Sequence, residues 1–284
     1  MSQTPAIHAA EVERPVLDLS GEGLRAILSA MIAGSEDHGG IERYVDAVKL
    51  KNDMFRQAVG DGAAANLELE TFKGLCTFMA TVRRRVGNWL TEETFADMRE
   101  GIVELFAEED NVDGRIAGFC ARFPNDKKHR WVRDLAAELL HNADPERVPL
   151  MTRWVWDAKS NTGVIREIWH GENVDHITIP VGDGFGTYLM LREELSQFLS
   201  DEGFFRDVLQ YVDILCAQTY AQYICEQGGS YLRADFSAPE DPMQHTRRLL
   251  GLDGVQAGSG KTRLKTIDGD AFLLDAEETS EQAH

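Results

Sequence analysis

Hydrophobic residues recur at helical spacing along most of the chain. Leu24, Ile27 and Met31 follow the pattern of an amphipathic helix that stops at Gly34, and Ser20 is a suitable N-cap for it. The same spacing predicts five more helices: one between Gly40 and Gly60, one over 68–89, one capped by Thr91, one broken by Pro124, and one over 128–141.

The helical pattern continues, with interruptions, to residue 173. Asp144 and Pro145 have the residue types of an N-cap and a first helical position. Pro149 interrupts or restarts this segment, which carries Trp154 and Trp156. A further helix is expected to open at 161–162 and to end at 170–171.

A β-like pattern begins at residue 174. The segments 174–181 and 187–191, joined by glycine-rich 182–186, predict a β hairpin. Helices are expected to return over 192–199, 204–226 and 244–250. A second hairpin is expected near the C-terminus, where Asp-Gly at 268–269 joins 263–267 to 271–274.

These patterns predict a mainly α fold: a multi-helix domain with two short β hairpins in the C-terminal half of the chain. Residues 1–17 are expected to form a mobile arm. Residues 18–234 are expected to form the helical domain, with the first hairpin at about 174–191. Residues 235–284 are expected to supply a linker, a short helix and the C-terminal hairpin or tail.

The charge of the chain narrows the classes of partner. The 284 residues include 48 Asp and Glu but only 29 Lys and Arg, which gives a net charge of −19. Such acidity disfavours nonspecific binding to nucleic acid or to an anionic membrane. No targeting segment or membrane span is predicted, so we expect a cytoplasmic protein without a membrane partner.

One block of the chain departs from this acidity. Residues 115–166 carry ten Arg and Lys against six Asp and Glu, a net +4, and 115–170 contains four of the five tryptophans. Arginine and tryptophan together suit anionic ligands and protein interfaces. The candidate contact residues for a protein partner or an anionic small molecule are Arg153, Trp154, Trp156 and Arg166.

The same block contains two Glu-x-x-His spacings, which suggest metal binding. Residues three apart share a helix face, so Glu138 with His141, and Glu167 with His170, could hold a di-metal centre of iron or manganese. Both histidines also stand at predicted helix C-termini, where a cation suits the helix dipole. A purely structural role therefore competes with the metal site.

Three functions follow from these observations. The first is a cytosolic binding or accessory protein that uses the Arg/Trp segment, by which we mean the stretch that carries Arg153, Trp154, Trp156 and Arg166. The second is a non-haem di-metal carboxylate enzyme, an oxidoreductase. The third is nucleic-acid binding through the basic block 115–166, which the net charge disfavours. An oligomer is compatible with all three.

Overall fold

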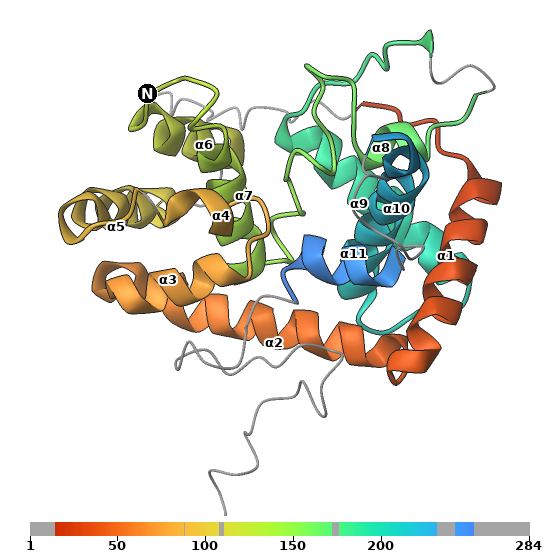
Figure 1. Cartoon of the computed structure of the whole chain (residues 1–284), viewed down its shortest axis with the longest axis horizontal. Helices are drawn as coiled ribbons and strands as arrows, with labels where there is room; N and C mark the ends of the chain where they lie inside the picture. The colour runs from red at the N-terminus through yellow and green to blue at the C-terminus, as the bar shows by residue number, and fades with distance from the viewer. Residues whose placement is uncertain (1–14, 88, 108–110, 172–175, 232–241, 253–284) are drawn as a thin grey trace, which may run out of the picture.

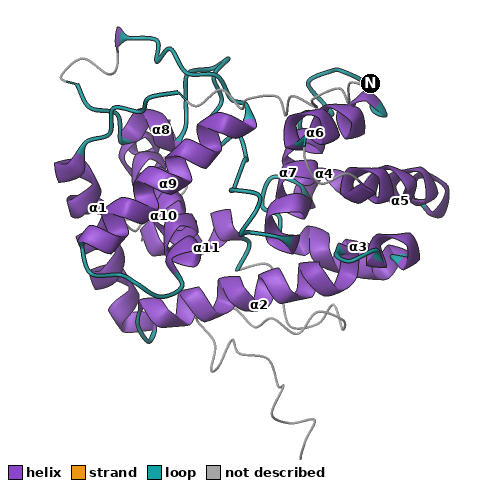
Figure 2. Cartoon of the chain, turned by 180° about the vertical axis from the view of Figure 1, so that it is seen from behind, coloured by secondary structure: helices purple, strands orange, loops and turns teal. Residues whose placement is uncertain are grey.

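The computed structural model describes residues 15–87, 89–107, 111–171, 176–231 and 242–252, and for 227–231 it describes the backbone alone. The described part is mainly helical, which confirms the predicted class, and it contains no strand (Figure 2). Its elements, with η for short 3₁₀ helices, are α1 (Gly21–Ser35), η1 (Glu36–His38), α2 (Ile41–Val59), η2 (Ala63–Asn66), α3 (Leu69–Thr77), α4 (Arg83–Val86), α5 (Glu92–Ala107), α6 (Val112–Ala121), α7 (Trp131–Ala143), α8 (Val164–Glu167), α9 (Phe185–Asp201), α10 (Val208–Tyr231) and α11 (Pro242–Leu250).

Helix α2 connects two groups of helices. It runs along one side of the molecule, with α3 to α7 gathered over one end and α1 and α8 to α11 over the other (Figure 1). It packs against α7 of the first group and against α1 and α10 of the second. The connection 144–163 passes between the groups, and the buried apolar side chains form one continuous cluster.

Helices α7 and α10 form the centre of the fold. Residues 134–143 of α7 and 211–219 of α10 are buried on every face, as expected of helices enclosed by other elements. Helix α10 is surrounded by α1, α2, α8, α9 and α11. None of the described helices is both long enough and apolar enough to cross a membrane.

Several predicted helix ends are confirmed. The Ser20 hydroxyl accepts a hydrogen bond from Gly23 N at 3.2 Å, and the Thr91 hydroxyl accepts one from Thr94 N at 3.2 Å. The single helix predicted over 68–89 is wrong, because the chain breaks after α3 and resumes as the short α4. Phe78 and Met79, both fully buried, fill the break, so tertiary packing overrides the helical pattern there.

The helices predicted between residues 144 and 170 are largely wrong. Only α8 is helical, and the rest is an ordered connection in which Asp157 and Thr162 exchange backbone hydrogen bonds of 2.9 and 3.3 Å. Gly163 has φ +123°, and a Cβ atom there would lie 2.6 Å from Val155 O. The tight turn at 157–163 thus brings α8 back against the segment that carries Trp154 and Trp156.

The hairpin predicted at about 174–191 is also wrong where the structure describes it. Residues 187–191 lie inside α9, which buries Tyr188, Leu191 and Leu195 at helical spacing. Its first amide, Phe185 N, donates to both carboxylate oxygens of Asp113 at 2.9 and 3.0 Å. Residues 177–183 have no strand partner, and 172–175 lie outside the described residues.

The described part of the C-terminal region belongs to the main core. Helix α11 packs against α10 and α1, and Met243 and Leu252 are each 1% exposed. Leu17, at the end of the predicted arm, is also buried. Residues 1–14 of the arm and the second hairpin, at 263–274, lie outside the described residues.

Candidate functional site

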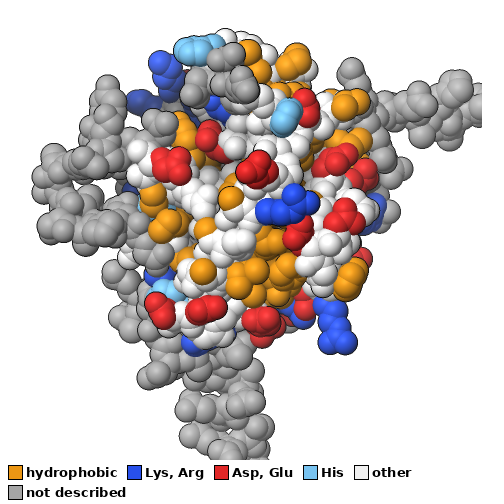
Figure 3. Space-filling view, turned by 90° about the vertical axis from the view of Figure 1, so that its right-hand side faces the viewer, with side chains coloured by type: hydrophobic (Ala, Val, Ile, Leu, Met, Phe, Trp, Pro, Cys, Tyr) orange, Lys and Arg blue, Asp and Glu red, His pale blue; other side chains and the backbone are white. Residues whose placement is uncertain are grey.

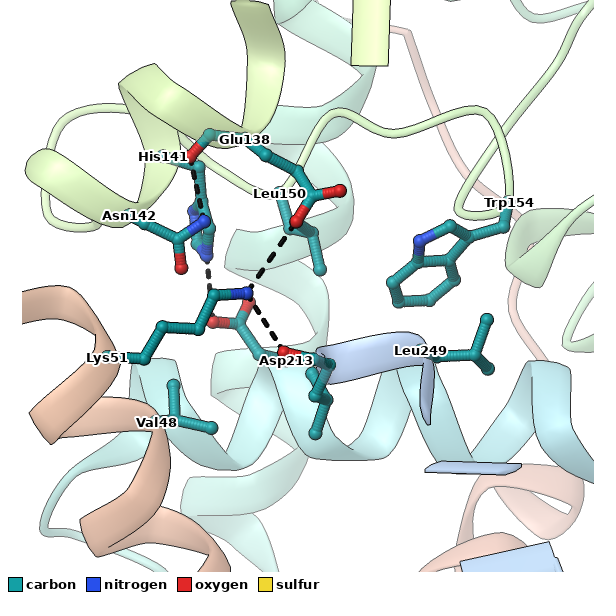
Figure 4. Close-up of a pocket in the computed structure, with 10 residues that line it drawn as sticks. Val48, Lys51, Glu138, His141, Asn142, Leu150, Trp154, Asp213 and Leu249 are labelled. Atoms are coloured by element: carbon teal, nitrogen blue, oxygen red, sulfur yellow. Dashed lines mark hydrogen bonds and ion pairs between the residues drawn. The ribbon is translucent and has the colours of Figure 1, made fainter. Parts of the chain in front are cut away.

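A small cavity lies where both groups of helices meet. Ten residues line it: Val48 and Lys51 from α2, Glu138, His141 and Asn142 from α7, Asp213 from α10, Leu249 and Leu250 from α11, and Leu150 and Trp154 from the connection between α7 and α8 (Figure 4). Spacings of three residues place Val48 beside Lys51, and Glu138 beside His141, on the same helix faces.

Four ionisable side chains meet in this cavity. Lys51, Glu138, His141 and Asp213 are between 2% and 5% exposed, and they come from three different helices. Charged side chains are almost never buried to this degree unless they are paired.

Lys51 and Glu138 form the first pair. Lys51 Nζ lies 3.6 Å from Glu138 Oε2 and donates to the carbonyl oxygen of Leu250 at 2.9 Å (Figure 4). Burial lowers the pKa of Lys51, although the charge of Glu138 opposes this. Burial also raises the pKa of Glu138 to about 7, against the attraction of Lys51. Both shifts favour the neutral forms, so desolvation outweighs the attraction between the two charges.

His141 and Asp213 form the second pair. His141 Nδ1 lies 2.9 Å from Val148 O, and because a carbonyl oxygen only accepts, this nitrogen is the donor. His141 Nε2 lies 3.0 Å from Asp213 Oδ2, which is hydrogen-bonding distance. Both ring nitrogens are therefore engaged, which fixes the orientation of the imidazole.

Two asparagines extend the polar network, Asn142 in the cavity lining and Asn52 behind it. Asn142 Nδ2 donates to Glu138 O at 2.7 Å, and Asn52 Nδ2 donates to Asn142 Oδ1 at 3.3 Å. The Asn52 Oδ1 atom is buried without a hydrogen-bond partner within the described structure. A buried acceptor without a partner costs about 1–3 kcal/mol, so this network is not optimised for stability.

The cavity is small in this conformation. The free space between its side chains accommodates about one water molecule. The last residues of α11, Leu249 and Leu250, form one wall, and the bond from Lys51 to Leu250 O ties this wall to α2. A ligand larger than this space therefore requires its walls, of which the end of α11 is one, to shift.

Gly251 holds the end of α11 in place. It has φ +74°, and a Cβ atom there would collide with the carbonyl oxygen of Phe78. We expect Gly251→Ala to lower the free energy of unfolding by about 2 kcal/mol or more, measured by urea denaturation. Gly203→Ala is the matched control, because Gly203 has φ +96° but open space around its Cβ position. Equal losses in both variants would contradict the close contact.

The structure assigns most of the Arg/Trp segment to internal contacts. Arg153 donates from Nε and Nη2 to the fully buried carboxylate of Asp134, with a shortest distance of 2.6 Å. Trp156 is 0% exposed, and its Nε1 donates to Val181 O at 3.1 Å. Arg166, which is half-buried, donates to Asn161 O at 3.2 Å. Of the four candidates only Trp154 lines the cavity.

The structure does not bring the four candidate metal ligands together. Glu138 and His141 are buried in the cavity, whereas Glu167 and His170 are exposed. The hydrogen bonds of His141 occupy both ring nitrogens, so neither is open to a metal ion. Across the described ranges, no group of three or more His, Cys, Asp and Glu side chains is arranged to hold a metal. We derive no role for iron or manganese.

Sequence reasoning missed Lys51 and Asp213. Lys51 and Asn52 fall between Val48 and Phe55 in the apolar stripe of α2, and polar residues inside such a stripe are a readable sign of a buried site. Asp213 interrupts the apolar run of α10 in the same way. The pairing of these residues with α7 comes only from the tertiary structure.

Comparisons with known proteins supply no family for this chain. No protein-family model matches it, and neither the curated proteins nor the solved structures contain a significant match.

Proposed function

We propose that this protein binds a small anionic molecule in the cavity between α2, α7, α10 and α11, and that it transfers a proton to or from that molecule. The observation that carries the proposal is the convergence of four buried ionisable side chains on one cavity. In this proposal Lys51 contacts the anion, and Glu138 exchanges the proton. His141, whose two ring nitrogens are bonded to Val148 O and Asp213, forms part of the cavity wall.

Stability alone does not account for the cluster. Buried ion pairs are often less favourable than apolar residues of similar volume, because desolvation can exceed the attraction. The pKa directions of Lys51 and Glu138 indicate this case. Ionisable groups with shifted pKa values beside a cavity are typical of functional sites.

Glu138 has the acidity that proton transfer near neutral pH requires. A general acid or base works best when its pKa lies near the working pH, and burial raises that of Glu138 to about 7. The carboxyl group also lies within 3.6 Å of Lys51 Nζ, so a molecule held by Lys51 is within reach of the proton.

Charge balance favours an anionic ligand. When Glu138 is protonated, the ammonium group of Lys51 loses its nearest counter-charge, and among the described residues the Leu250 carbonyl is the hydrogen-bond partner that remains. A carboxylate or phosphate on the ligand restores the balance. Trp154, Leu150 and Leu249 give the same cavity an apolar wall for the rest of the molecule.

Thermal unfolding in the presence of small anions tests the proposal. We expect acetate, glycolate, pyruvate or phosphate at millimolar concentration to raise the Tm of the wild type, because binding to the folded state stabilises it. The shift is expected to be lost in Lys51→Met and retained in Lys159→Met, which removes an exposed lysine. Equal shifts in the two variants would contradict a role for Lys51.

A further inference from the structure

The two carboxyl oxygens of Glu138 face different neighbours. Oε2 lies 3.6 Å from Nζ of Lys51, which lines the cavity. Oε1 lies 3.4 Å from the hydroxyl of Thr81, which donates to it. This separation is long for a hydroxyl hydrogen bond, as is common before a ligand binds. Thr81 does not line the cavity, so Glu138 connects the cavity with a residue outside it.

Thr81 lies in the break between α3 and α4, in a turn that is held by the backbone. The amides of Val82 and Arg83 both donate to Met79 O, at 3.0 and 2.9 Å. Met79 and Val82 are fully buried, whereas Thr81 between them is half-buried. The Thr81 side chain therefore contacts the buried carboxyl group and is also partly accessible to solvent.

The other polar neighbours of Glu138 offer no comparable path to solvent. Lys51 is 5% exposed, His141 is 4% exposed and Asn142 is 2% exposed. Both ring nitrogens of His141 are also hydrogen-bonded to other groups. A proton on a group as buried as Glu138 reaches solvent either through a neighbour or by local opening of the fold. Among the contacts described for Glu138, Thr81 is the partly exposed one.

The contact with Thr81 leads away from the side of the molecule that carries α1. Helix α1 packs against α10 and α11, two of the walls of the cavity, and covers them on that side (Figure 1). Figure 3 shows this face, where hydrophobic side chains gather between Asp and Glu side chains. The break between α3 and α4 belongs instead to the first group of helices. A route through Thr81 therefore reaches solvent on the side of that group.

We propose that the hydroxyl of Thr81 relays the proton between Glu138 and solvent water. This inference rests on the function proposed for the cavity, because Glu138 must regain or lose a proton after each transfer. In one concerted step, Thr81 Oγ1 accepts the proton of Glu138 while its own proton passes to a water molecule. The step leaves a carboxylate, an intact hydroxyl and a hydronium ion, and its reverse protonates Glu138. A hydroxyl can serve in both directions because it has one donor and two acceptor sites.

Exchange of the Glu138 proton in heavy water tests the relay without any ligand. Rapid-mixing infrared spectroscopy at pH 5.5, below the pKa of about 7, follows the C=O band of the protonated carboxyl group, identified by its absence in Glu138→Gln. Thr81→Val keeps the shape of the side chain but removes the hydroxyl. We expect it to slow the exchange by about tenfold or more beyond any change in the pKa of Glu138, titrated through the same band. Thr81→Ser is expected to retain the wild-type rate.

A matched variant separates the relay from a structural effect. Thr77 is also half-buried, but its hydroxyl donates to Gly74 O at 2.6 Å, so Thr77→Val is expected to leave the exchange unchanged. Equal rates in the wild type and Thr81→Val, slow exchange in Thr81→Ser, or the absence of the protonated band would each overturn the relay. If no anion raises the Tm of the wild type, the proposed function fails, whereas the exchange rates still decide the relay.

Discussion

Replacing Trp156 by alanine is expected to lower the free energy of unfolding by about 3–5 kcal/mol. The side chain is 0% exposed, and its Nε1 donates to the carbonyl oxygen of Val181 at 3.1 Å. Removing it leaves a large cavity and a buried acceptor without its donor. Equilibrium denaturation in urea measures the loss.

Trp156→Phe separates the two contributions. It keeps most of the apolar volume but removes the hydrogen bond to Val181 O, so we expect a loss of about 1–3 kcal/mol. Trp89→Ala is a useful comparison, because Trp89 is only partly buried and should lose less. A Trp156→Ala protein within about 1 kcal/mol of the wild type would contradict the internal role that burial and the bond to Val181 O assign to this tryptophan.

Residue types alone could not decide the role of the Arg/Trp segment. Arginine and tryptophan are typical of interfaces, but the same two types make good internal contacts when a carboxylate or a carbonyl faces them. Here Asp134 faces Arg153, and Val181 faces Trp156. Both partners lie at least 19 residues away along the chain. Only the tertiary structure brings these partners together.

Local signals predicted the helical class and several helix ends well. The caps Ser20 and Thr91 and the limits of α2 depend on residues within a few positions of each other, and these predictions are confirmed. The prediction was wrong where packing between distant segments decides the conformation. In α9, for example, the carboxylate of Asp113 binds the first amide, and no pattern within 182–191 contains that information.

The sequence identified two of the four ionisable residues of the candidate site. The Glu-x-x-His spacing singled out Glu138 and His141, which do lie in the cavity. The chemistry inferred from that spacing was metal binding, whereas the observed partners are Lys51 and Asp213. A lysine paired with a glutamate 87 residues away has no sequence signature, so the proposal of an acid–base site in place of a metal site required the structure.

The double variant Lys51→Met/Glu138→Leu is expected to be more stable than the wild type at pH 8, by about 1–4 kcal/mol. Apolar residues of similar volume avoid the desolvation that drives both pKa values toward the neutral forms. The same variant is expected to lose its thermal response to small anions. A gain in stability with a loss of binding is the trade-off expected of a functional site.

The pH dependence of stability identifies the contribution of Glu138. Its pKa is raised from 4.5 in the unfolded chain to about 7 in the folded protein, so folding favours the protonated form. The stability that it contributes is therefore fully present below pH 4.5 and is lost as the pH rises through 7, by up to about 3 kcal/mol. Glu138→Gln carries no titrating group at this position, and its advantage over the wild type should grow between pH 4.5 and 8.

Destabilisation of the double variant would reverse the interpretation of the cavity. The Lys51–Glu138 pair would then hold α2, α7 and the end of α11 together, and its burial would be explained without a ligand. Stabilisation of the double variant, in contrast, means that the charges of Lys51 and Glu138 lower the free energy of unfolding and are not needed for folding. In that case the binding of an anion explains why the two destabilising charges are present. The loss of the thermal response to anions in the same variant connects the stability measurement with the binding measurement.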